Sequence, residues 1–432
     1  MTNAHHPPYP AYKPSDADWL GDIPAHWEVR RLKFLASVIF SNVDKHSKEE
    51  ELPIRLCNYV DVYKNEHIVS SLDFMEATAG INEIRKFTLK KGDIIITKDS
   101  EEWQDIAVPA LVSEELDNVI CGYHLALIRP FPNIVGNGYL FRSFQAAAIN
   151  YQFQVAASGI TRYGLGKQAL GNSLFLVPPL AEQRAIADYL DRETAQIDAL
   201  IAKKRELLDL LEHQRTALIS HAVTKGLNPA APLKPSGVDW LGDIPAHWEV
   251  RRLKFVARFA YGDSLNVVNR EDGNVPVFGS NGIVGTHNEA NTFAPCIVIG
   301  RKGSFGKVKY SDIPVFAIDT TFYVDSRCTK QDLRWLYYTL GLLGLDESSQ
   351  DSAVPGLSRE FAYNQYVPFP PLAEQRAIAE YLDRETAQID RLKGEVEASI
   401  DLLQRYRTAL ISAAVTGKID VRVPAAASCP SA

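Results

Sequence analysis

The chain has 432 residues, of which 46% are hydrophobic and 23% charged, and its formal net charge is −7. These values predict two or three globular domains and argue against a disordered or fibrous chain. The acidic balance also argues against a protein that grips nucleic acid by its overall charge alone, so such binding would need local basic patches and a partner that supplies further phosphate contacts.

The opening residues 1–16 lack the basic and then apolar pattern of an export signal. No apolar run approaches the roughly 20 residues that a membrane helix needs, so we expect a cytoplasmic protein. The cysteines are odd in number, widely scattered and form no CxxC pair, which predicts neither a disulfide framework nor a metal site. These cysteines are Cys57, Cys121, Cys296, Cys328 and Cys429.

Three segments of the chain recur almost unchanged, the shortest of which covers residues 215–224 and returns at residues 407–416 with one change, His221 to Ala413. The first, which we call the frame segment, covers residues 19–34 and returns letter for letter at residues 240–255. The second covers residues 178–200 and returns at residues 370–392 with two changes, Asp188 to Glu380 and Ala199 to Arg391. Each frame segment holds two tryptophans, expected to be packing residues, and a basic stretch that could equally touch phosphate or face solvent. Repeats of this kind predict a duplicated architecture.

The blocks between the repeats, residues 35–177 and 256–369, show little similarity to each other. A recent tandem duplication would have left these inserts alike as well. Near-identical frames around dissimilar inserts therefore indicate a cassette layout, in which the frames offer two equivalent surfaces to one kind of partner. The inserts are then expected to recognise two different things.

The first insert combines short β-branched runs with turns, which predicts an α/β or α+β domain with a twisted sheet. Residues 90–100 and 121–130 are expected to form strands, and residues 158–166 a glycine-rich loop. Side chains that donate hydrogen bonds from such loops are suited to base edges and phosphates. The candidate binding residues in this insert are Lys98, Thr161, Arg162 and Tyr163.

A long helix is predicted to follow the first insert. Residues 180–223 contain no proline or glycine, and apolar residues recur at spacings of three, four and seven. The repeat predicts an equal helix after the second insert. A helix of this length, roughly 60 Å, cannot bury its apolar stripe alone, so we expect the two helices to pair as an antiparallel coiled coil.

The second insert is predicted to hold strands within residues 277–285, 297–310 and 317–324, separated by polar loops. Arg301 could make a bidentate contact with guanine or a phosphate, whereas Lys302 is a point charge better suited to phosphate. The candidate binding residues in this insert are Asn281, Arg301, Lys302, Ser304, Ser358 and Arg359.

The predicted organisation has seven parts: a lead-in with the first frame segment (1–34), the first insert (35–177), a central long helix (178–226), a linker with the second frame segment (227–255), the second insert (256–369), a closing long helix (370–416) and a tail (417–432).

Motifs of catalysis are missing from the sequence. The proline pairs lack the pattern with which amino-methyltransferases hold a flipped base, and there is no glycine-rich cofactor loop. Residues 300–307 resemble a phosphate-binding loop, but Val308 stands where a hydroxyl should bind magnesium. His124 and His287 lack ligand-like spacing, so ordinary roles are expected for both. We predict a protein with no catalytic site of its own.

Together these motifs resemble the specificity subunits of type I restriction-modification systems. The resemblance rests on the Pro-Pro-Leu-Ala-Glu-Gln-Arg start of each long helix, on the frame segment, and on the second insert, where residues 278–285, 299–304 and 319–322 match one type of recognition domain. The likeness spans nearly the whole chain except about a dozen residues at either end. The first insert resembles a different domain type, and more loosely.

The resemblance implies a subunit that binds double-stranded DNA at a bipartite, asymmetric site, with one half for each insert. It also implies two modification subunits, which carry S-adenosylmethionine and methylate adenine, and restriction subunits, which hydrolyse ATP with Mg and cut DNA. No cofactor is then expected on this chain. Two alternatives stay open: a coiled-coil scaffold without DNA recognition, and a methyltransferase or nuclease with unfamiliar motifs.

Overall fold

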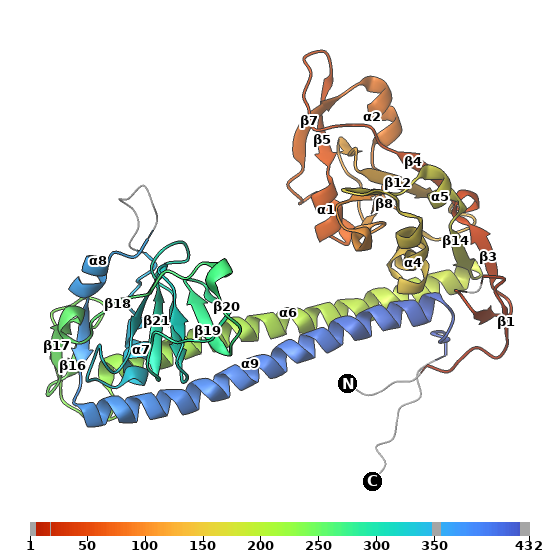
Figure 1. Ribbon diagram of the computed structural model, residues 1–432. Coiled ribbons are helices and arrows are strands. Elements are labelled where there is room, and N and C mark those ends of the chain that lie inside the picture. Colours follow the sequence, from red (N-terminus) through yellow and green to blue (C-terminus); the bar gives the residue numbers. More distant parts are fainter. Residues whose placement is uncertain (1–5, 18, 348–355, 424–432) are drawn as a thin grey trace, which may run out of the picture. The chain divides into compact units, whose positions relative to one another are not determined.

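The computed structural model describes residues 6–17, 19–347 and 356–423, so Cys429 and the end of the predicted tail lie outside the described residues. The chain divides into two compact units, which we describe separately (Figure 1). Unit 1 comprises Met1–Lys204 and Ala398–Ala432, and unit 2 comprises Arg205–Glu397. Each predicted long helix therefore contributes to both units, which a linear list of domains does not anticipate.

In unit 1, the first insert (residues 35–177), named the first recognition domain after the role that the resemblance implies, contains a five-stranded sheet in the order β4-β12-β8-β10-β6 and a three-stranded sheet in the order β11-β5-β7. The central strand β8 is a run of isoleucines with no exposed residue, as expected for a strand covered on both faces. The strands of unit 1 are β1 (Tyr12–Pro14), β2 (Asp22–Pro24), β3 (Glu28–Arg31), β4 (Ala36–Phe40), β5 (Leu52–Cys57), β6 (His67–Ile68), β7 (Met75–Ala79), β8 (Ile94–Thr97), β9 (Asp99–Ser100), β10 (Pro109–Val112), β11 (Val119–Cys121), β12 (Leu125–Pro130), β13 (Tyr163–Gly164) and β14 (Leu174–Val177).

The short helices of the first recognition domain cover its sheets and connect them to the long helices. α3 is the most deeply buried of them, since Tyr139 to Phe144 all lie in the core. These helices are α1 (Tyr59–Lys64), α2 (Ile81–Phe87), α3 (Asn137–Gln145), α4 (Ala147–Ala156) and α5 (Lys167–Asn172).

In unit 2, the second recognition domain (residues 256–369) is smaller, with a four-stranded sheet in the order β18-β24-β21-β22 and a three-stranded sheet in the order β20-β19-β23. All three predicted strand regions are confirmed. The strands of unit 2 are β15 (Leu233–Pro235), β16 (Asp243–Pro245), β17 (Glu249–Arg252), β18 (Ala260–Tyr261), β19 (Val275–Gly279), β20 (Gly282–His287), β21 (Cys296–Gly300), β22 (Val308–Ser311), β23 (Phe316–Ala317), β24 (Thr321–Val324) and β25 (Tyr366–Phe369), and its short helices are α7 (Leu333–Leu340) and α8 (Arg359–Asn364).

Both predicted long helices are present as α6 (Leu180–Lys225) and α9 (Leu372–Val415). Each begins directly after its proline pair. The carbonyl of the second proline, Pro179 or Pro371, accepts hydrogen bonds from the backbone amides three and four residues further along the helix. At 46 residues, α6 is about 70 Å long. Gly226 and Gly417, both with φ of +71°, end the two helices in the left-handed conformation that suits glycine.

The long helices pair as predicted. In unit 1, Ile197 and Ile201 of α6 share a buried cluster with Leu403 and Leu410 of α9. The direction is visible in unit 2, where Glu212 pairs with Lys393 at 2.6 Å and Arg215, further along α6, pairs with Asp390, earlier in α9, at 3.3 Å. Partners that run in opposite senses make the pair antiparallel, in agreement with the predicted coiled coil.

The predicted packing role of the tryptophans is right for one of each pair. Trp27 and Trp248 are completely buried, whereas Trp19 and Trp240 remain partly exposed. No helix among the described residues is long and apolar enough to cross a membrane.

Candidate nucleic-acid interface

The repeated segments hold each other in place. In unit 1, the frame segment binds the start of α6, because the Trp27 indole N–H donates to Glu182 Oε1 at 2.9 Å and His26 Nε2 lies 2.8 Å from Glu182 Oε2. The same segment packs on the end of α9, since a Cβ built at Gly417 would lie 2.4 Å from Pro24 and 3.2 Å from the Trp27 ring. One frame segment thus joins the beginning of one long helix to the end of the other.

Unit 2 repeats this arrangement with the helices exchanged. Trp248 donates to Glu374 Oε2 at 2.9 Å, and His247 Nε2 lies 2.7 Å from Glu374 Oε1, at the start of α9. A Cβ at Gly226, which ends α6, would lie 3.0 Å from the Trp248 ring. The sequence shows that both segments recur, but nothing in it indicates that the tryptophan of one binds the glutamate of the other.

A second repeated side chain orients each recognition domain on its helix. Gln183 donates to the carbonyl of Pro178 at 2.8 Å and accepts the N–H of Gly136, which caps α3, at 2.8 Å. In unit 2, Gln375 donates to Pro370 at 2.9 Å and accepts the N–H of Asp332, the capping residue of α7, at 3.0 Å. The Glu-Gln pair of each helix start therefore fixes the frame segment with one side chain and the adjacent domain with the other.

The structure brings the glycine-rich loop of the first recognition domain, which carries three of the candidates, next to the strand that follows Lys98. β13 in the glycine-rich loop pairs with β9, the strand that follows Lys98, and the Leu165 N–H donates to the Lys98 carbonyl at 2.8 Å. Thr161 and Arg162 are exposed, and Arg162 lies 4.0 Å from Glu101. The turn requires Gly159, at φ +147°, because a Cβ there would meet the Arg162 carbonyl oxygen at 1.9 Å.

Lys98 differs from the other candidates in being only 8% exposed. Its ammonium group pairs with Asp99 and lies 4.8 Å from the centre of the Tyr123 ring. Asp99 also lies 3.2 Å from Nδ1 of His124, so this histidine has the ordinary paired role expected for it. Any contact of Lys98 with DNA would first require the Asp99 pair to open, and its binding role stays a prediction.

Aromatic side chains that sequence reasoning did not select lie around this surface. The rings of Tyr59 and Tyr63 stack at 5.6 Å, and the Tyr59 hydroxyl lies 3.1 Å from Ser100 Oγ in β9. Burial raises the pKa of Tyr59, and the nearby Asp105 raises that of Tyr63. Tyr63, Trp103 and Tyr123 are all exposed. They come from separate short elements, so no periodic pattern in the sequence could have grouped them.

In the second recognition domain, two predicted arginines share one aromatic ring. The guanidinium carbons of Arg301 and Arg359 lie 5.0 and 4.8 Å from the centre of the Tyr261 ring. Arg301 is further held by donating from Nη1 to the Asp319 carbonyl at 2.9 Å. Cation–π contacts of this kind hold guanidinium groups in a fixed orientation. The sequence predicted the two arginines but missed Tyr261.

The backbone brings the other candidates of this domain close to Arg301. The chain turns sharply at Gly300, where a Cβ would lie 2.4 Å from the Ser304 carbonyl oxygen. Lys302 forms a bridge with Gly356, two residues before Ser358. Asn281 accepts a hydrogen bond from Lys307 at 2.7 Å. The loops that carry the candidates therefore converge, as the sequence could not show.

Ser358 and His287 have structural roles in this domain, and only the role of Ser358 was not indicated by the sequence. Ser358 caps α8 by accepting the Phe361 N–H at 3.4 Å, so its oxygen is already engaged. His287 accepts the Glu271 N–H at 3.1 Å and is nearly buried, in keeping with the ordinary role expected for it.

Comparison with known proteins identifies the family. The family model for the type I restriction modification DNA specificity domain matches residues 24–209 and 245–401. A relative from Methanocaldococcus jannaschii, the putative type I restriction enzyme MjaX specificity subunit, is 22% identical over 93% of this chain and 96% of its own length.

Two solved structures share the fold. One, from a study of complex assembly and conformational transition in a type I R-M system, has a TM-score of 0.70 at 19% identity and covers 91% of this chain and 98% of its own. The other, a crystal structure of the HsdS subunit from Thermoanaerobacter tengcongensis, has a TM-score of 0.51 at 19% identity and covers 92% and 98%.

Proposed function

The chain belongs to the family of type I restriction-modification DNA specificity subunits, and from this premise we propose that the surface around Tyr261 reads one half of its bipartite DNA site while the surface around β9 and β13 reads the other. A specificity subunit is the non-catalytic member of its complex. The observation that carries the assignment is the convergence of the candidate residues, which lie on distant segments of sequence, at one surface in each domain.

The two surfaces have different chemistry, which supports an asymmetric site. The second domain offers Arg301 and Arg359, held on Tyr261, and arginine is the side chain best suited to bidentate contact with guanine or phosphate. The first domain offers exposed aromatic rings beside a lysine that is already paired with Asp99. Such rings favour apolar and stacking contacts over phosphate binding.

We further propose that two modification subunits bind the two copies of the repeated segments. Large apolar side chains stay exposed at equivalent positions of both copies, and a surface kept twice can bind the same partner twice. These pairs are Trp19 and Trp240, Phe34 and Phe255, and Leu180 and Leu372, while Leu210 of α6 and Leu402 of α9 form a further exposed pair outside the repeated segments. Restriction subunits would join the same cytoplasmic complex. S-adenosylmethionine, ATP and Mg would then be bound by the partners.

The net charge of −7 is consistent with a subunit that recognises bases while its partner subunits bind most of the DNA phosphates. Phosphate neutralisation supplies most of the sequence-independent affinity for DNA. An acidic subunit with local arginines would contribute base recognition, while its partners would supply much of the phosphate contact. The assembled complex is therefore the form in which binding should be measured.

The test compares two neighbouring side chains, Arg301 and Lys302. Methylome sequencing of cells with and without the gene first defines the site. In the reconstituted complex, Arg301→Ala should weaken specific binding by about 1–3 kcal/mol and relax discrimination in one half-site. Lys302→Ala should weaken binding to all sequences alike and lower the salt slope by about one.

Arg391→Ala provides the control, because it removes an exposed positive charge from α9, outside the second recognition domain. Affinities for matched and mismatched duplexes across a salt series decide the outcome. If neither Arg301→Ala nor Lys302→Ala differs from the control, the surface around Tyr261 does not read DNA.

A further inference from the structure

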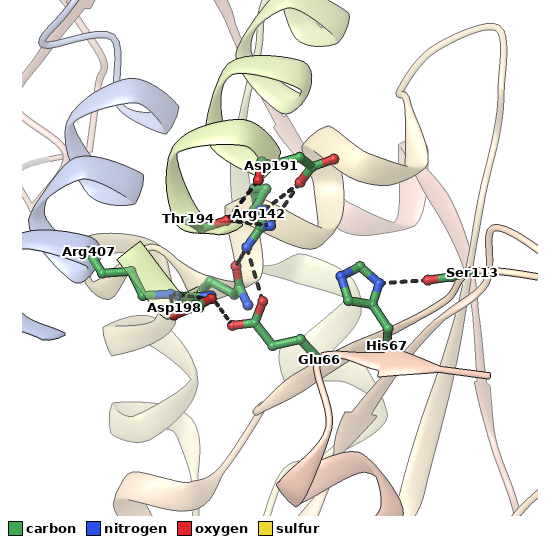
Figure 2. Close-up of polar contacts among 9 residues, drawn as sticks. Glu66, His67, Ser113, Arg142, Asp191, Thr194, Asp198 and Arg407 are labelled. Atoms are coloured by element: carbon green, nitrogen blue, oxygen red, sulfur yellow. Dashed lines mark hydrogen bonds and ion pairs between the residues drawn. The ribbon is translucent and has the colours of Figure 1, made fainter. Parts of the chain in front are cut away.

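An ion-pair network in unit 1 connects the first recognition domain to both long helices (Figure 2). At its centre, Arg142 of α3 has a side chain only 3% exposed. Its Nε and Nη2 donate to Asp191 Oδ1 at 3.0 and 2.8 Å, Nη2 also donates to Thr194 at 3.0 Å, and Nη1 donates to Gln145 at 2.8 Å and to Glu66 at 3.2 Å. Every nitrogen of the guanidinium group is thereby engaged, which fixes its position.

Glu66 is the member of the network that belongs to the sheet of the recognition domain. It directly precedes β6, and its carbonyl accepts the Leu111 N–H of β10 at 2.8 Å, so its backbone is fixed at the sheet edge. The next residue, His67, lies with Nδ1 2.6 Å from Ser113 Oγ, as Figure 2 shows. The carboxylate of Glu66 therefore extends from a rigid edge rather than from a free loop.

The two oxygens of Glu66 bind arginines from different elements. Oε2 accepts from Arg142, and Oε1 accepts from Arg407 of α9, which also pairs with Asp198 of α6 at 3.0 Å. Burial by itself would lower the pKa of Arg407, but the carboxylates of Glu66 and Asp198 outweigh it and raise that pKa. One carboxylate thus links the sheet edge, α3 and α9, and through their arginines α6.

Unit 2 keeps the helix part of this network, but among the residues that the structure describes no carboxylate of its sheet pairs with Arg215 or Arg334. Arg215 pairs with Asp390 at 3.3 Å, at the repeat positions of Arg407 and Asp198. Two side chains of α7 bind Asp383 in place of Arg142. The Tyr338 hydroxyl donates to Asp383 at 2.6 Å and lies 3.2 Å from Thr386, and Arg334 Nε donates to Asp383 at 2.5 Å. Arg334 also lies 4.3 Å from the centre of the Tyr310 ring in β22, so it meets the sheet by a cation–π contact and not by an ion pair with a carboxylate.

From this difference, and resting on the proposed function, we infer that Glu66 is a positioning residue. It latches the first recognition domain to α6 and α9 in unit 1, and so determines how strictly the complex measures the distance between the two halves of its site. The bases read by the domain depend on the surface around β9 and β13, which Glu66 does not contact. Loss of the latch should therefore alter the spacing preference and leave base preference intact.

The experiment uses the reconstituted complex and duplexes that carry the methylome-defined site, either unchanged or with the spacer one base pair longer or shorter. Glu66→Gln keeps the shape of the side chain and removes its charge. We expect it to reduce the preference for the native spacing by about tenfold while mismatches within each half-site are still rejected as in wild type. Amide hydrogen exchange on the same complex should show faster exchange at residues 59–68 and 398–411.

Asp198→Asn is the matched control, because it weakens the pairing of α6 with α9 at the same arginine but leaves Glu66 in place. It should lower stability without relaxing spacing. Equal spacing preference in Glu66→Gln and wild type, or equal relaxation in the control, would overturn the inference. If the wild-type complex itself fails to discriminate sites, the proposed function fails and the positioning role with it, whereas unchanged exchange in Glu66→Gln disproves the latch alone.

Discussion

The two units use the same contacts to hold their frame segments and different contacts to hold their recognition domains. In both, a buried tryptophan donates to the glutamate at the start of a long helix, at 2.9 Å. Beyond this point they diverge. Unit 1 places Arg142 against Asp191 and links it to Glu66, whereas unit 2 places Tyr338 and Arg334 against Asp383 without a carboxylate that corresponds to Glu66 among the described residues. The contacts that bind each frame segment to a helix start are therefore the same in both units, whereas the contacts between a recognition domain and its helix differ.

The largest effect is expected from exchanging a whole domain. If the domains read independently, replacing residues 35–177 with a recognition domain of another specificity should abolish binding to the original site, a loss of about 4 kcal/mol or more. The half-site assigned to the second domain should be unchanged. Methylome sequencing of cells that carry the hybrid provides the measurement. A hybrid in which both half-sites change would contradict the separation of the two domains.

A smaller effect, on the free energy of unfolding, is expected to differ between the two equivalent glutamates Glu182 and Glu374. The side chain of Glu182 is 3% exposed and is also approached by Arg422 at 3.3 Å, whereas that of Glu374 is 41% exposed. Glu182→Ala leaves the buried Trp27 indole N–H without a partner and takes one of two carboxylates from Arg422, which keeps Asp420, so it should cost about 3 kcal/mol, the upper end of the usual cost of an unsatisfied buried donor. Glu374→Ala should lower the free energy of unfolding by only about 1 kcal/mol, because water can replace the hydrogen bonds of this more exposed carboxylate. Calorimetric unfolding of both variants compares them directly.

Glu182→Gln serves as a control for this pair, because it keeps an acceptor for the Trp27 indole while removing the charge. It should fall between Glu182→Ala and wild type. Equal destabilisation by the two alanine variants would mean that Arg422 and the deeper burial add nothing in unit 1.

The smallest effect concerns Tyr338, the counterpart of Arg142 in unit 2. Burial and the hydrogen bond to Asp383 raise the pKa of Tyr338 to about 12, so the hydroxyl stays protonated and donating at neutral pH. Tyr338→Phe should cost about 1 kcal/mol, the usual value of one hydrogen bond, and should leave half-site spacing unaltered. Tyr337→Phe is the control at the neighbouring ring. A spacing change in Tyr338→Phe would show that unit 2 is latched as well.

The sequence was sufficient to predict the elements that depend on local pattern. An uninterrupted run of helix formers with apolar residues at spacings of three, four and seven predicted α6, and the repeat predicted α9 in spite of Gly394 in its interior. The strands of the second domain were predicted by their β-branched runs. These features need no knowledge of distant residues.

Contacts between distant residues were beyond such reasoning. Trp27 and Glu182 are 155 residues apart, and no alignment or periodicity connects them. Tyr261 lies on a two-residue strand far in sequence from Arg301 and Arg359, so its role as their shared platform emerges only from the fold. Lys98 was selected for its charge, but its burial beside Asp99 depends on the tertiary structure.

The identity of the two frame segments has a consequence for folding. Either segment could dock on either helix start, in its own chain or in a second copy, because the residues it contacts are equivalent. The length of chain between a segment and each helix start favours the correct docking only weakly, because doubling the length of a loop costs only about 0.6 kcal/mol in closure entropy. Correct docking must therefore be enforced by what differs between the units, such as the contact of Arg422 with Glu182. When newly made chains are at high concentration, partly folded chains would be prone to exchange these segments and form domain-swapped dimers.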